Sequence, residues 1–210
     1  MRLSYMAGLL WMMLGSCVGD PQLTREGHKA SFCNEPSDRL IRDWETQLTG
    51  SWKQVLSSYF LVSTDLVDMN CVDLEIRMAN KVPLAFQINQ SSIQHENPAL
   101  KVHTSYTLKD ADLIDGYWVF NNTKHRPGYR LRCARTWAGD DDVEEIKPFD
   151  VAVWTGTDNL SMMVWTRDVG EFYKTHSRNV TAFLKSIDFT GRYKRPIVTY
   201  DEKVCHGDDV

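Results

Sequence analysis

Apolar and polar residues alternate through most of the chain after residue 50. The alternation is clearest from Val72 to Met78, where Asp73, Glu75 and Arg77 separate four apolar residues. An apolar residue at every second position is typical of an antiparallel strand with one buried and one exposed face. A first strand begins at about residue 50, and similar runs occupy 72–78, 84–88, 102–108, 117–120, 129–135, 149–155 and 160–166.

The spacing of apolar residues becomes helical after Asp168. It predicts one amphipathic helix at about 169–186, followed by a short last strand at 197–200. We interpret His176 as a packing residue on the apolar face of this helix. The apolar face consists of Phe172, His176, Val180, Phe183, Leu184 and Ile187.

A chain with eight consecutive strands needs a way to protect its two sheet edges. A closed up-and-down barrel removes them, and eight strands leave room inside for one small ligand. We therefore expect an all-β fold at 50–205. It would be an eight-stranded antiparallel barrel with the C-terminal helix packed outside and a short final strand. Residues 20–49 would form an N-terminal arm and residues 206–210 a tail.

Residues 1–19 have the layout of a secretory signal peptide. Arg2 is followed by an apolar run at 6–14 and by small residues at 15–19. This predicts cleavage after Gly19 and a secreted, extracellular protein. The apolar run is too short to span a bilayer comfortably, and no later stretch is long enough. A buried N-terminal helix and a lipoprotein signal ending at Cys17 are the alternatives.

Secretion changes what the cysteines imply. Loss of Cys17 with the signal peptide leaves an even number, which suggests two disulfides in an oxidising compartment. The remaining cysteines are Cys33, Cys71, Cys133 and Cys205, and the residues alone leave all three pairings open. Four N-x-S/T sequons also predict a glycoprotein. Their acceptor residues are Asn89, Asn121, Asn159 and Asn179.

Composition and charge exclude several classes of protein. The 210 residues are 42% hydrophobic and 25% charged, which is ordinary for a globular protein and unlike a disordered or coiled-coil chain. The net charge is −4, and the absence of a basic block argues against nucleic-acid binding. Aromatic residues make up 11% of the chain, enough to fill a core or to line a cavity.

The sequence holds no catalytic or cofactor motif. Signatures of a nucleophile elbow, a zincin helix, a P-loop and a dinucleotide-binding loop are all missing. His95-Glu96 continues into Asn97-Pro98, and the acidic run at 140–145 lacks the glycine and spacing of an EF-hand. We therefore expect no enzymatic activity, no metal and no cofactor.

The start of the first strand resembles the signature of the lipocalins. Gly50-Ser51-Trp52 is a G-x-W motif that follows Asp43-Trp44 and a short turn, and Arg167 ends the eighth strand just before the helix. In that family the tryptophan closes one end of the barrel and the arginine packs across it. The resemblance therefore implies a structural plug, with a cation–π contact between Trp52 and Arg167. The family's T-D-Y motif is absent, since Glu145-Ile146-Lys147 stands in its place.

The resemblance also implies a disulfide pattern. Cys71 and Cys205 resemble the second-strand and C-terminal cysteines of insect bilin-binding and apolipoprotein D-like lipocalins. This implies the pairs Cys71–Cys205 and Cys33–Cys133. The prostaglandin-synthase type of lipocalin uses a free barrel cysteine as its nucleophile, and this pairing leaves none free.

A lipocalin-like barrel implies a protein that carries or sequesters a small hydrophobic molecule, such as a retinoid, bilin, sterol or fatty acid. Such a ligand would lie against the inward face of the strands. We expect the inward, candidate ligand-binding residues to be Val72, Leu74, Ile76, Met78, Leu84, Phe86, Ile88, Tyr106, Val151 and Val153.

Two other functions remain open. Residues 59–62 resemble the first strand of tick salivary lipocalins, which bind histamine, serotonin or eicosanoids. A cationic biogenic amine would need an internal carboxylate, which Asp73 and Glu75 supply only if their strand is shifted by one residue. The last possibility is a secreted glycoprotein with a filled barrel that binds a protein partner. Exposed aromatic residues such as Tyr117 and Trp118 would favour it.

Overall fold

The computed structural model describes residues 43–59, 69–94, 99–115, 117–122, 128–136 and 146–205. The strands are β1 (Gly50–Ser58), β2 (Met69–Lys81), β3 (Leu84–Gln94), β4 (Lys101–Ile114), β5 (Tyr117–Asn122), β6 (Tyr129–Arg135), β7 (Val151–Gly156), β8 (Met162–Thr166) and β9 (Pro196–Val198). The helical elements are α1 (Trp44–Leu48), α3 (Val169–Glu171), the π-helical turn η2 (Phe172–His176), α4 (Ser177–Ser186), α5 (Gly191–Lys194) and α6 (Glu202–Cys205).

Strands β1 to β8 form a closed barrel in which each strand pairs with its sequence neighbours. Antiparallel pairing runs in order from β2 to β8, and β8 and β2 both pair with β1, which closes the ring. Strand β9 pairs with the second half of β1, outside the ring. The predicted all-β fold, an eight-stranded antiparallel up-and-down barrel, is confirmed.

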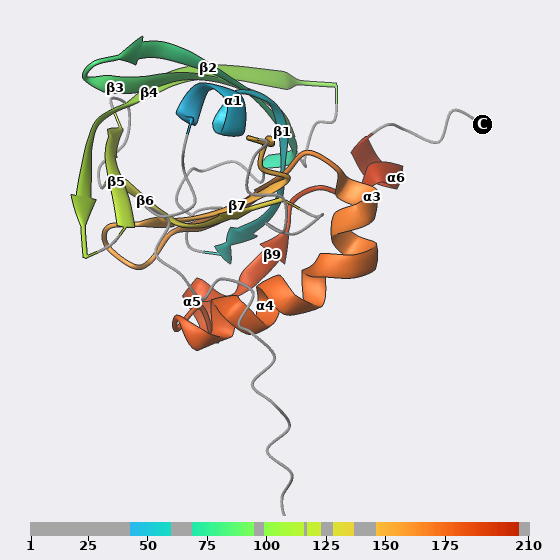
Figure 1. The fold of residues 1–210 in the computed structure, drawn as a ribbon. Coiled ribbons are helices and arrows are strands. Elements are labelled where there is room, and N and C mark those ends of the chain that lie inside the picture. Colours follow the sequence, from blue (N-terminus) through green and yellow to red (C-terminus); the bar gives the residue numbers. More distant parts are fainter. Residues whose placement is uncertain are drawn as a thin grey trace, which may run out of the picture.

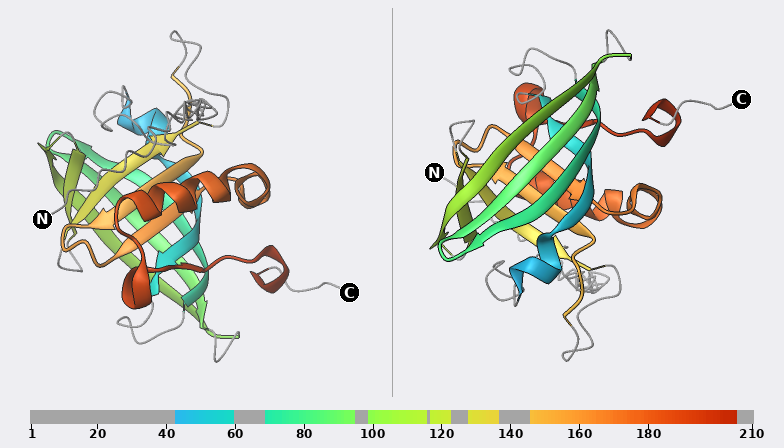
Figure 2. Two further views of the ribbon diagram at one scale, coloured as in Figure 1. Left: turned by 90° about the horizontal axis from the view of Figure 1, so that it is seen from below. Right: turned by 90° about the horizontal axis from the view of Figure 1, so that it is seen from above.

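The C-terminal helix packs against the outside of the barrel, as Figures 1 and 2 show. It runs from Val169 to Ser186 through α3, η2 and α4, which matches the span predicted from the helical spacing. Asp168 caps its N-terminus by accepting a hydrogen bond of 2.9 Å from the backbone N–H of Glu171. His176 lies half-buried in the π-helical turn, and burial lowers its pKa.

Two hydrophobic clusters lie on either side of the β7–β8 wall. The interior cluster includes Trp52, Leu74, Phe86 and Trp154. The outer cluster joins the helix to the wall and includes Phe172 and Leu184. Strands β7 and β8 are buried on both faces as a result, with every residue of both strands buried. The barrel interior therefore has its own lining, separate from the residues that hold the helix.

A disulfide joins Cys71 of β2 to Cys205 of α6, 134 residues further along the chain. It is the first of the two pairs that the lipocalin resemblance implied. Cys133 is also disulfide-bonded, but its predicted partner, Cys33, lies outside the described residues. The signal peptide and residues 20–42 of the predicted arm also lie outside them. Among the described helices, none has the length and hydrophobicity needed to cross a membrane.

Candidate functional site

One end of the barrel is closed by a contact between its first and last strands. The guanidinium carbon of Arg167, just after β8, lies 4.3 Å from the ring centroid of Trp52 in β1. The indole Nε1 of Trp52 donates a hydrogen bond of 2.8 Å to the carbonyl of Leu48 in α1. Trp52 is almost completely buried, so this tryptophan ties α1, β1 and the end of β8 into one plug.

The guanidinium of Arg167 also binds several backbone carbonyls around the plug. Its Nε donates to Phe149 O at 2.6 Å, and one Nη2 bond reaches Thr49 O at 2.7 Å. Longer bonds reach the carbonyls of Gln47 and Ser51. Burial lowers the pKa of Arg167, but an arginine stays charged throughout the physiological range. The planar fork therefore joins carbonyls of the α1–β1 region to that of Phe149, just before β7.

Gly50 is needed at the plug for two physical reasons. Its φ angle of +104° lies in a region that side chains disfavour. A Cβ at this position would also lie 2.9 Å from Nη1 of Arg167. The glycine of the G-x-W motif thus lets the backbone turn into β1 directly beneath the arginine.

Helix α1 carries an aromatic side chain into the closed end. Asp43 caps the helix by accepting hydrogen bonds from the Glu45 N–H at 3.1 Å and the Thr46 hydroxyl at 2.7 Å. Trp44 follows the cap, and its ring packs edge-on against Trp118 and Phe120, with centroid distances of 5.3 and 5.6 Å. The cap therefore sets the position of the first ring in a larger aromatic assembly.

The aromatic assembly continues through the interior of the barrel. Phe120 packs against Trp154 at 5.8 Å, and Trp154 packs against Trp165 at 4.9 Å. The indole Nε1 atoms of Trp118, Trp154 and Trp165 are buried without a hydrogen-bond partner. Buried donors of this kind are uncommon because each loses its bond to water without replacement. Together they give the interior a row of unused hydrogen-bond donors, which we call the indole row.

Most of the predicted inward residues lie in the interior cluster. Six of them are buried members of this cluster: Val72, Leu74, Ile76, Phe86, Ile88 and Tyr106. Met78 and Leu84 are partly buried and pack against the same cluster. Contact between these residues and a ligand stays a prediction.

Val151 and Val153 require a correction. Both belong to the cluster beneath the C-terminal helix, so their predicted inward orientation is wrong. In β7 the inward residues are Ala152 and Trp154. The error arose because Val151 to Trp154 are all apolar and buried, so the alternation of apolar and polar residues that reveals orientation is absent from the start of β7.

Aromatic residues of β5, β7 and β8 were missing from the predicted lining. Trp118, Phe120, Trp154 and Trp165 all contact the interior cluster. The position of Trp154 beside the smaller Ala152 could have suggested the inward face of β7, but the sequence carries no signal for an unpaired indole.

The acidic residues of β2 lie on the outer face of the barrel. Asp73 pairs across the sheet with Lys53, and Glu75 pairs with Ser51. Asp73 forms an ion pair with Lys53, and Glu75 accepts a hydrogen bond of 2.7 Å from the Ser51 hydroxyl. The shifted register that would place these carboxylates inside the barrel is therefore absent.

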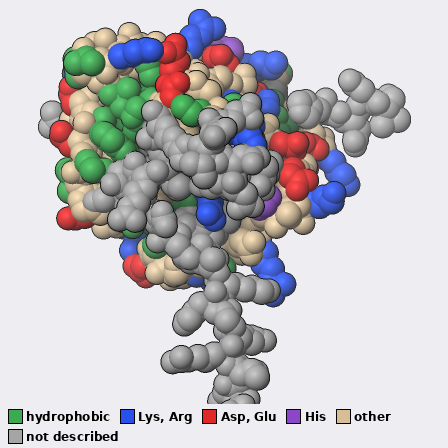
Figure 3. All heavy atoms as spheres, in the orientation of Figure 1, with side chains coloured by type: hydrophobic (Ala, Val, Ile, Leu, Met, Phe, Trp, Pro, Cys, Tyr) green, Lys and Arg blue, Asp and Glu red, His purple; other side chains and the backbone are tan. Residues whose placement is uncertain are grey.

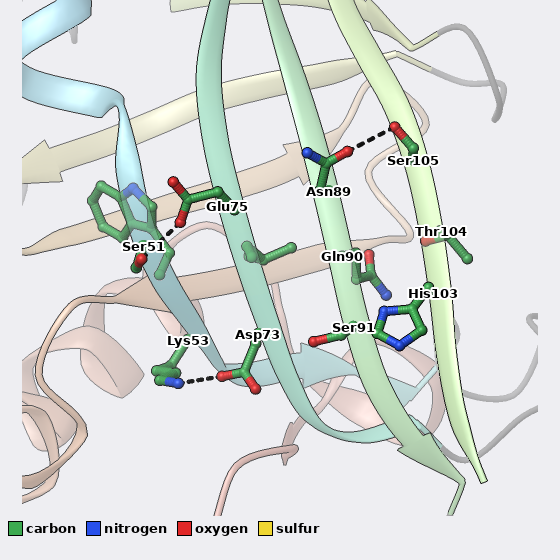
Figure 4. A pocket seen from close by; sticks show the side chains of 12 residues that line it. Ser51, Lys53, Asp73, Glu75, Asn89, Gln90, Ser91, His103, Thr104 and Ser105 are labelled. Atoms are coloured by element: carbon green, nitrogen blue, oxygen red, sulfur yellow. Dashed lines mark hydrogen bonds and ion pairs between the residues drawn. The ribbon is translucent and has the colours of Figure 1, made fainter.

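These residues belong to a shallow polar groove of about 520 Å³ on the outer wall, shown in Figure 4. Two rows of side chains cross the four strands β1 to β4 at this groove. One row ends in Ser105, whose hydroxyl donates to Asn89 Oδ1 at 2.9 Å. The rows consist of Ser51, Glu75, Asn89 and Ser105, and of Lys53, Asp73, Ser91 and His103. Trp52 and Leu74 also line the groove, but both are buried, so what it offers a bound molecule is mainly hydrogen bonds from these two rows.

The aromatic residues considered for a protein interface are engaged elsewhere. Trp118 packs into the aromatic assembly, and the ring of Tyr117 lies beneath the guanidinium of Arg132 at 4.9 Å. Exposed hydrophobic side chains do occur on two hairpins at the α1 end. They are Val82 between β2 and β3, and Leu113 and Ile114 at the end of β4. Figure 3 shows how hydrophobic side chains gather on one part of the surface.

The predicted glycosylation residues are all accessible. Asn89, Asn121, Asn159 and Asn179 are exposed on β3, β5, the β7–β8 turn and α4. Their modification stays a prediction. Within the part of the chain that the structure describes, no group of three or more metal-binding side chains occurs.

Comparison with known proteins finds similarity to solved structures and not to sequences. No protein-family model and no curated protein matches the sequence. A siderocalin, Ex-FABP, aligns with a TM-score of 0.46 and 14% identity, over 73% of this chain and 94% of its own. Lobster apocrustacyanin A1 aligns with a TM-score of 0.44 and 14% identity, over 73% of this chain and 77% of its own. H1 crustacyanin from the lobster Homarus americanus aligns with a TM-score of 0.47 and 12% identity, over 81% of this chain and 88% of its own. Similarity this distant transfers no ligand to this chain.

The fold itself rests on the chain's own topology. A closed barrel of eight antiparallel strands, a helix near the C-terminus and an extra strand paired outside match the lipocalin fold. The plug formed by Trp52 and Arg167 agrees with the resemblance noted from the G-x-W motif.

Proposed function

We propose that this protein is a secreted carrier that binds one small, largely apolar molecule inside the barrel. The indole row is the observation that carries the proposal, because three buried donors in an apolar interior lack a partner. A ligand with a suitably placed oxygen atom would satisfy them. The aromatic rings around the row supply flat apolar surface for the rest of such a molecule.

The chemistry of indole narrows the ligand. An indole Nε1–H donates a hydrogen bond and cannot accept one. The ligand should therefore present a carbonyl, carboxylate, ether or hydroxyl oxygen on a flat or elongated apolar body. Retinoids, bilins, sterols and fatty acids all fall within this class.

A cationic amine fits the described interior less well. Asp73 and Glu75, the carboxylates considered for it, lie on the outer wall. Aromatic faces alone attract a cation only modestly, by about 0.5–2 kcal/mol. A protonated amine would also compete with the indoles as a donor.

Secretion is proposed from the leader-like residues 1–19 together with the disulfide chemistry. The Cys71–Cys205 bond and the bonded state of Cys133 suit an oxidising compartment. A secreted carrier would meet a sparingly soluble ligand outside the cell and shield it from water.

Quenching of tryptophan fluorescence tests the proposal. The panel contains retinol, biliverdin and a long-chain fatty acid, with histamine and serotonin as amine competitors. We expect saturable quenching by at least one apolar member at micromolar concentration and none by the amines. Saturation by an amine alone, or by no member of the panel, would contradict the proposal.

Two conservative variants separate the indole row from general packing. Trp154→Phe keeps an aromatic ring in place and removes one unpaired donor, so affinity for the bound ligand should fall about tenfold. Trp44→Phe is the matched control, since Trp44 belongs to the same aromatic assembly and is not among the buried unpaired donors. Equal loss in both variants would show that the donor itself does not matter.

A further inference from the structure

Two arginines lie side by side on the outer wall of the barrel. Arg130 and Arg132 belong to β6 and flank Thr155 of β7 on the outward face. Neither guanidinium forms an ion pair in the part of the chain that the structure describes. Like charges held this close repel each other, so a bare pair is unfavourable unless an anion lies between them.

The backbone of β6 explains how the two side chains come together. The register with β7 shifts between Leu131 and Cys133, which places a β-bulge at Arg132. A bulge changes the direction of a side chain and interrupts the regular alternation. Leu131 points into the interior cluster while Cys133 joins the outer one. The bulge therefore changes the side of Cys133, whereas Arg132 lies two residues after Arg130 and shares its outer face, as in a regular strand.

Arg132 is held in a fixed position by three neighbours. Its Nε donates to the hydroxyl of Thr155 at 3.1 Å, and its Nη2 donates to Oδ1 of Asn159 at 3.3 Å. Its guanidinium also stacks on the ring of Tyr117 at 4.9 Å. All three neighbours are neutral, so they orient the arginine without balancing its charge. Burial lowers the pKa of Arg132, and the charge of Arg130 lowers it further.

Arg130 has unused donors beside this fixed group. Its Nε is buried and has no hydrogen-bond partner. A guanidinium carries five N–H donors in a planar fork, which matches the oxygens of a carboxylate, sulfate or phosphate. Arg132 uses its Nε and Nη2 for the bonds to Thr155 and Asn159, and its Nη1 takes part in neither.

We infer that Arg130 and Arg132 form a binding site for a small oxyanion, such as phosphate or sulfate, on the outer wall of the barrel. The anion would bind between the two guanidiniums, with Arg132 fixed in advance and Arg130 closing on it. The site is separate from the barrel interior, since the outward face of β6 is opposite to the face that carries Leu131. A negative result for the oxyanion site would therefore leave the proposed carrier function unchanged.

Thermal unfolding of the full disulfide-bonded chain tests the site. Sodium phosphate and sodium sulfate are compared with sodium chloride at equal ionic strength. We expect a saturable rise in Tm with the oxyanions beyond the chloride effect. Arg130→Gln should weaken the apparent affinity at least tenfold. Arg192→Gln is the matched control, because Arg192 also stacks on a tyrosine, Tyr193 at 5.6 Å, but belongs to α5 and not to β6, and it should bind as the wild type does.

A second readout separates binding from a general effect on stability. In a ¹H–¹⁵N spectrum of arginine side chains, the Nε–H signal of Arg130 should shift with phosphate while that of Arg192 stays in place. No saturable Tm rise beyond chloride, or an equal rise in Arg130→Gln, would overturn the inference. Sedimentation with phosphatidic acid vesicles identifies the source of the phosphate group. Binding that Arg130→Gln abolishes would indicate a lipid headgroup, and phosphate binding without sedimentation would indicate the free ion.

Discussion

The guanidinium of Arg167 lies over the ring of Trp52, 4.3 Å from its centroid, at the end of the barrel where α1 enters. The contact joins the end of β8 to the start of β1, and the same arginine binds carbonyls of the α1–β1 turn. The aromatic assembly and the indole row lie on the interior side of this plug. The plug therefore protects one end of the interior from water.

Trp52→Ala should destabilise the protein by about 3–5 kcal/mol, because it removes a buried aromatic side chain and leaves a cavity beneath Arg167. Urea unfolding followed by circular dichroism measures the change. Tyr193→Ala serves as the control, since Tyr193 is exposed and should cost little. If Trp52→Ala unfolded at the wild-type urea concentration, the assignment of Trp52 as a structural plug would be wrong.

Gly50→Ala should destabilise the protein more than Gly191→Ala. Both glycines have positive φ angles, +104° and +78°, so each alanine bears a backbone cost of about 1–2 kcal/mol. A Cβ at Gly50 also meets Arg167 at 2.9 Å, whereas a Cβ at Gly191 meets no described atom within 4 Å. The difference between the two free energies of unfolding isolates the contact with Arg167. A larger loss in Gly191→Ala would contradict the tight packing at the plug.

Removing the Cys71–Cys205 disulfide should lower the free energy of unfolding by up to about 4–5 kcal/mol. The bond closes a loop of 134 residues, and chain entropy in the unfolded state grows with loop length. The double variant Cys71→Ser/Cys205→Ser avoids leaving one reactive thiol. Peptide mapping without reduction checks the pairing directly, and recovery of Cys71 linked to any residue other than Cys205 would refute it.

Stability should fall as the pH rises from about 10 to about 12, because of Tyr173. Burial raises the pKa of its hydroxyl from 10.0 to about 12. The folded state therefore keeps a proton that the unfolded state loses, and this contribution is complete below pH 10 and disappears as the pH passes 12. The hydroxyl lies 3.2 Å from the carbonyl of Val55 and 3.1 Å from that of Tyr200.

Tyr173→Phe provides the comparison for this titration. At neutral pH the variant should have a free energy of unfolding about 1 kcal/mol lower than wild type, because it lacks the hydrogen bond of the hydroxyl. This difference in the free energy of unfolding should shrink as the pH rises from about 10 to about 12. Urea unfolding at several pH values measures both effects. A difference that stays constant from pH 9 to pH 12 would show that Tyr173 does not titrate as described.

The alternation of apolar and polar residues predicts the orientation of a strand that has one solvent-exposed face. It does not predict the orientation of a strand that is buried on both faces. The alternation of Asp73 and Glu75 with apolar neighbours reported the orientation of β2 correctly, since the carboxylates lie outside. Strand β7 begins with four apolar residues in a row, Val151 to Trp154, so the pattern there does not distinguish the two faces, and Val151 and Val153 were assigned to the wrong side. Helix α4 covers that face, and only the tertiary structure reveals the helix above it.

The candidate sites depend on relationships that no local pattern records. An indole without a partner reflects what surrounds Trp154 and Trp165 in three dimensions. The arginine pair depends on Thr155, Asn159 and Tyr117, which come from other parts of the chain and hold Arg132 in place. The G-x-W motif was more informative, because a glycine and a tryptophan two residues apart are both required by the geometry beneath Arg167.

The most direct test of the carrier function is a ¹H–¹⁵N spectrum of the tryptophan indoles, recorded with and without the apolar ligand that quenches fluorescence. The Nε1–H signals of Trp118, Trp154 and Trp165 report on the indole row. Trp52 is the internal reference, because its Nε1–H is already bonded to the carbonyl of Leu48. We predict that at least one signal of the row moves downfield on saturation while that of Trp52 stays in place. Binding that leaves all three signals of the row unchanged would contradict a ligand held by the interior indoles.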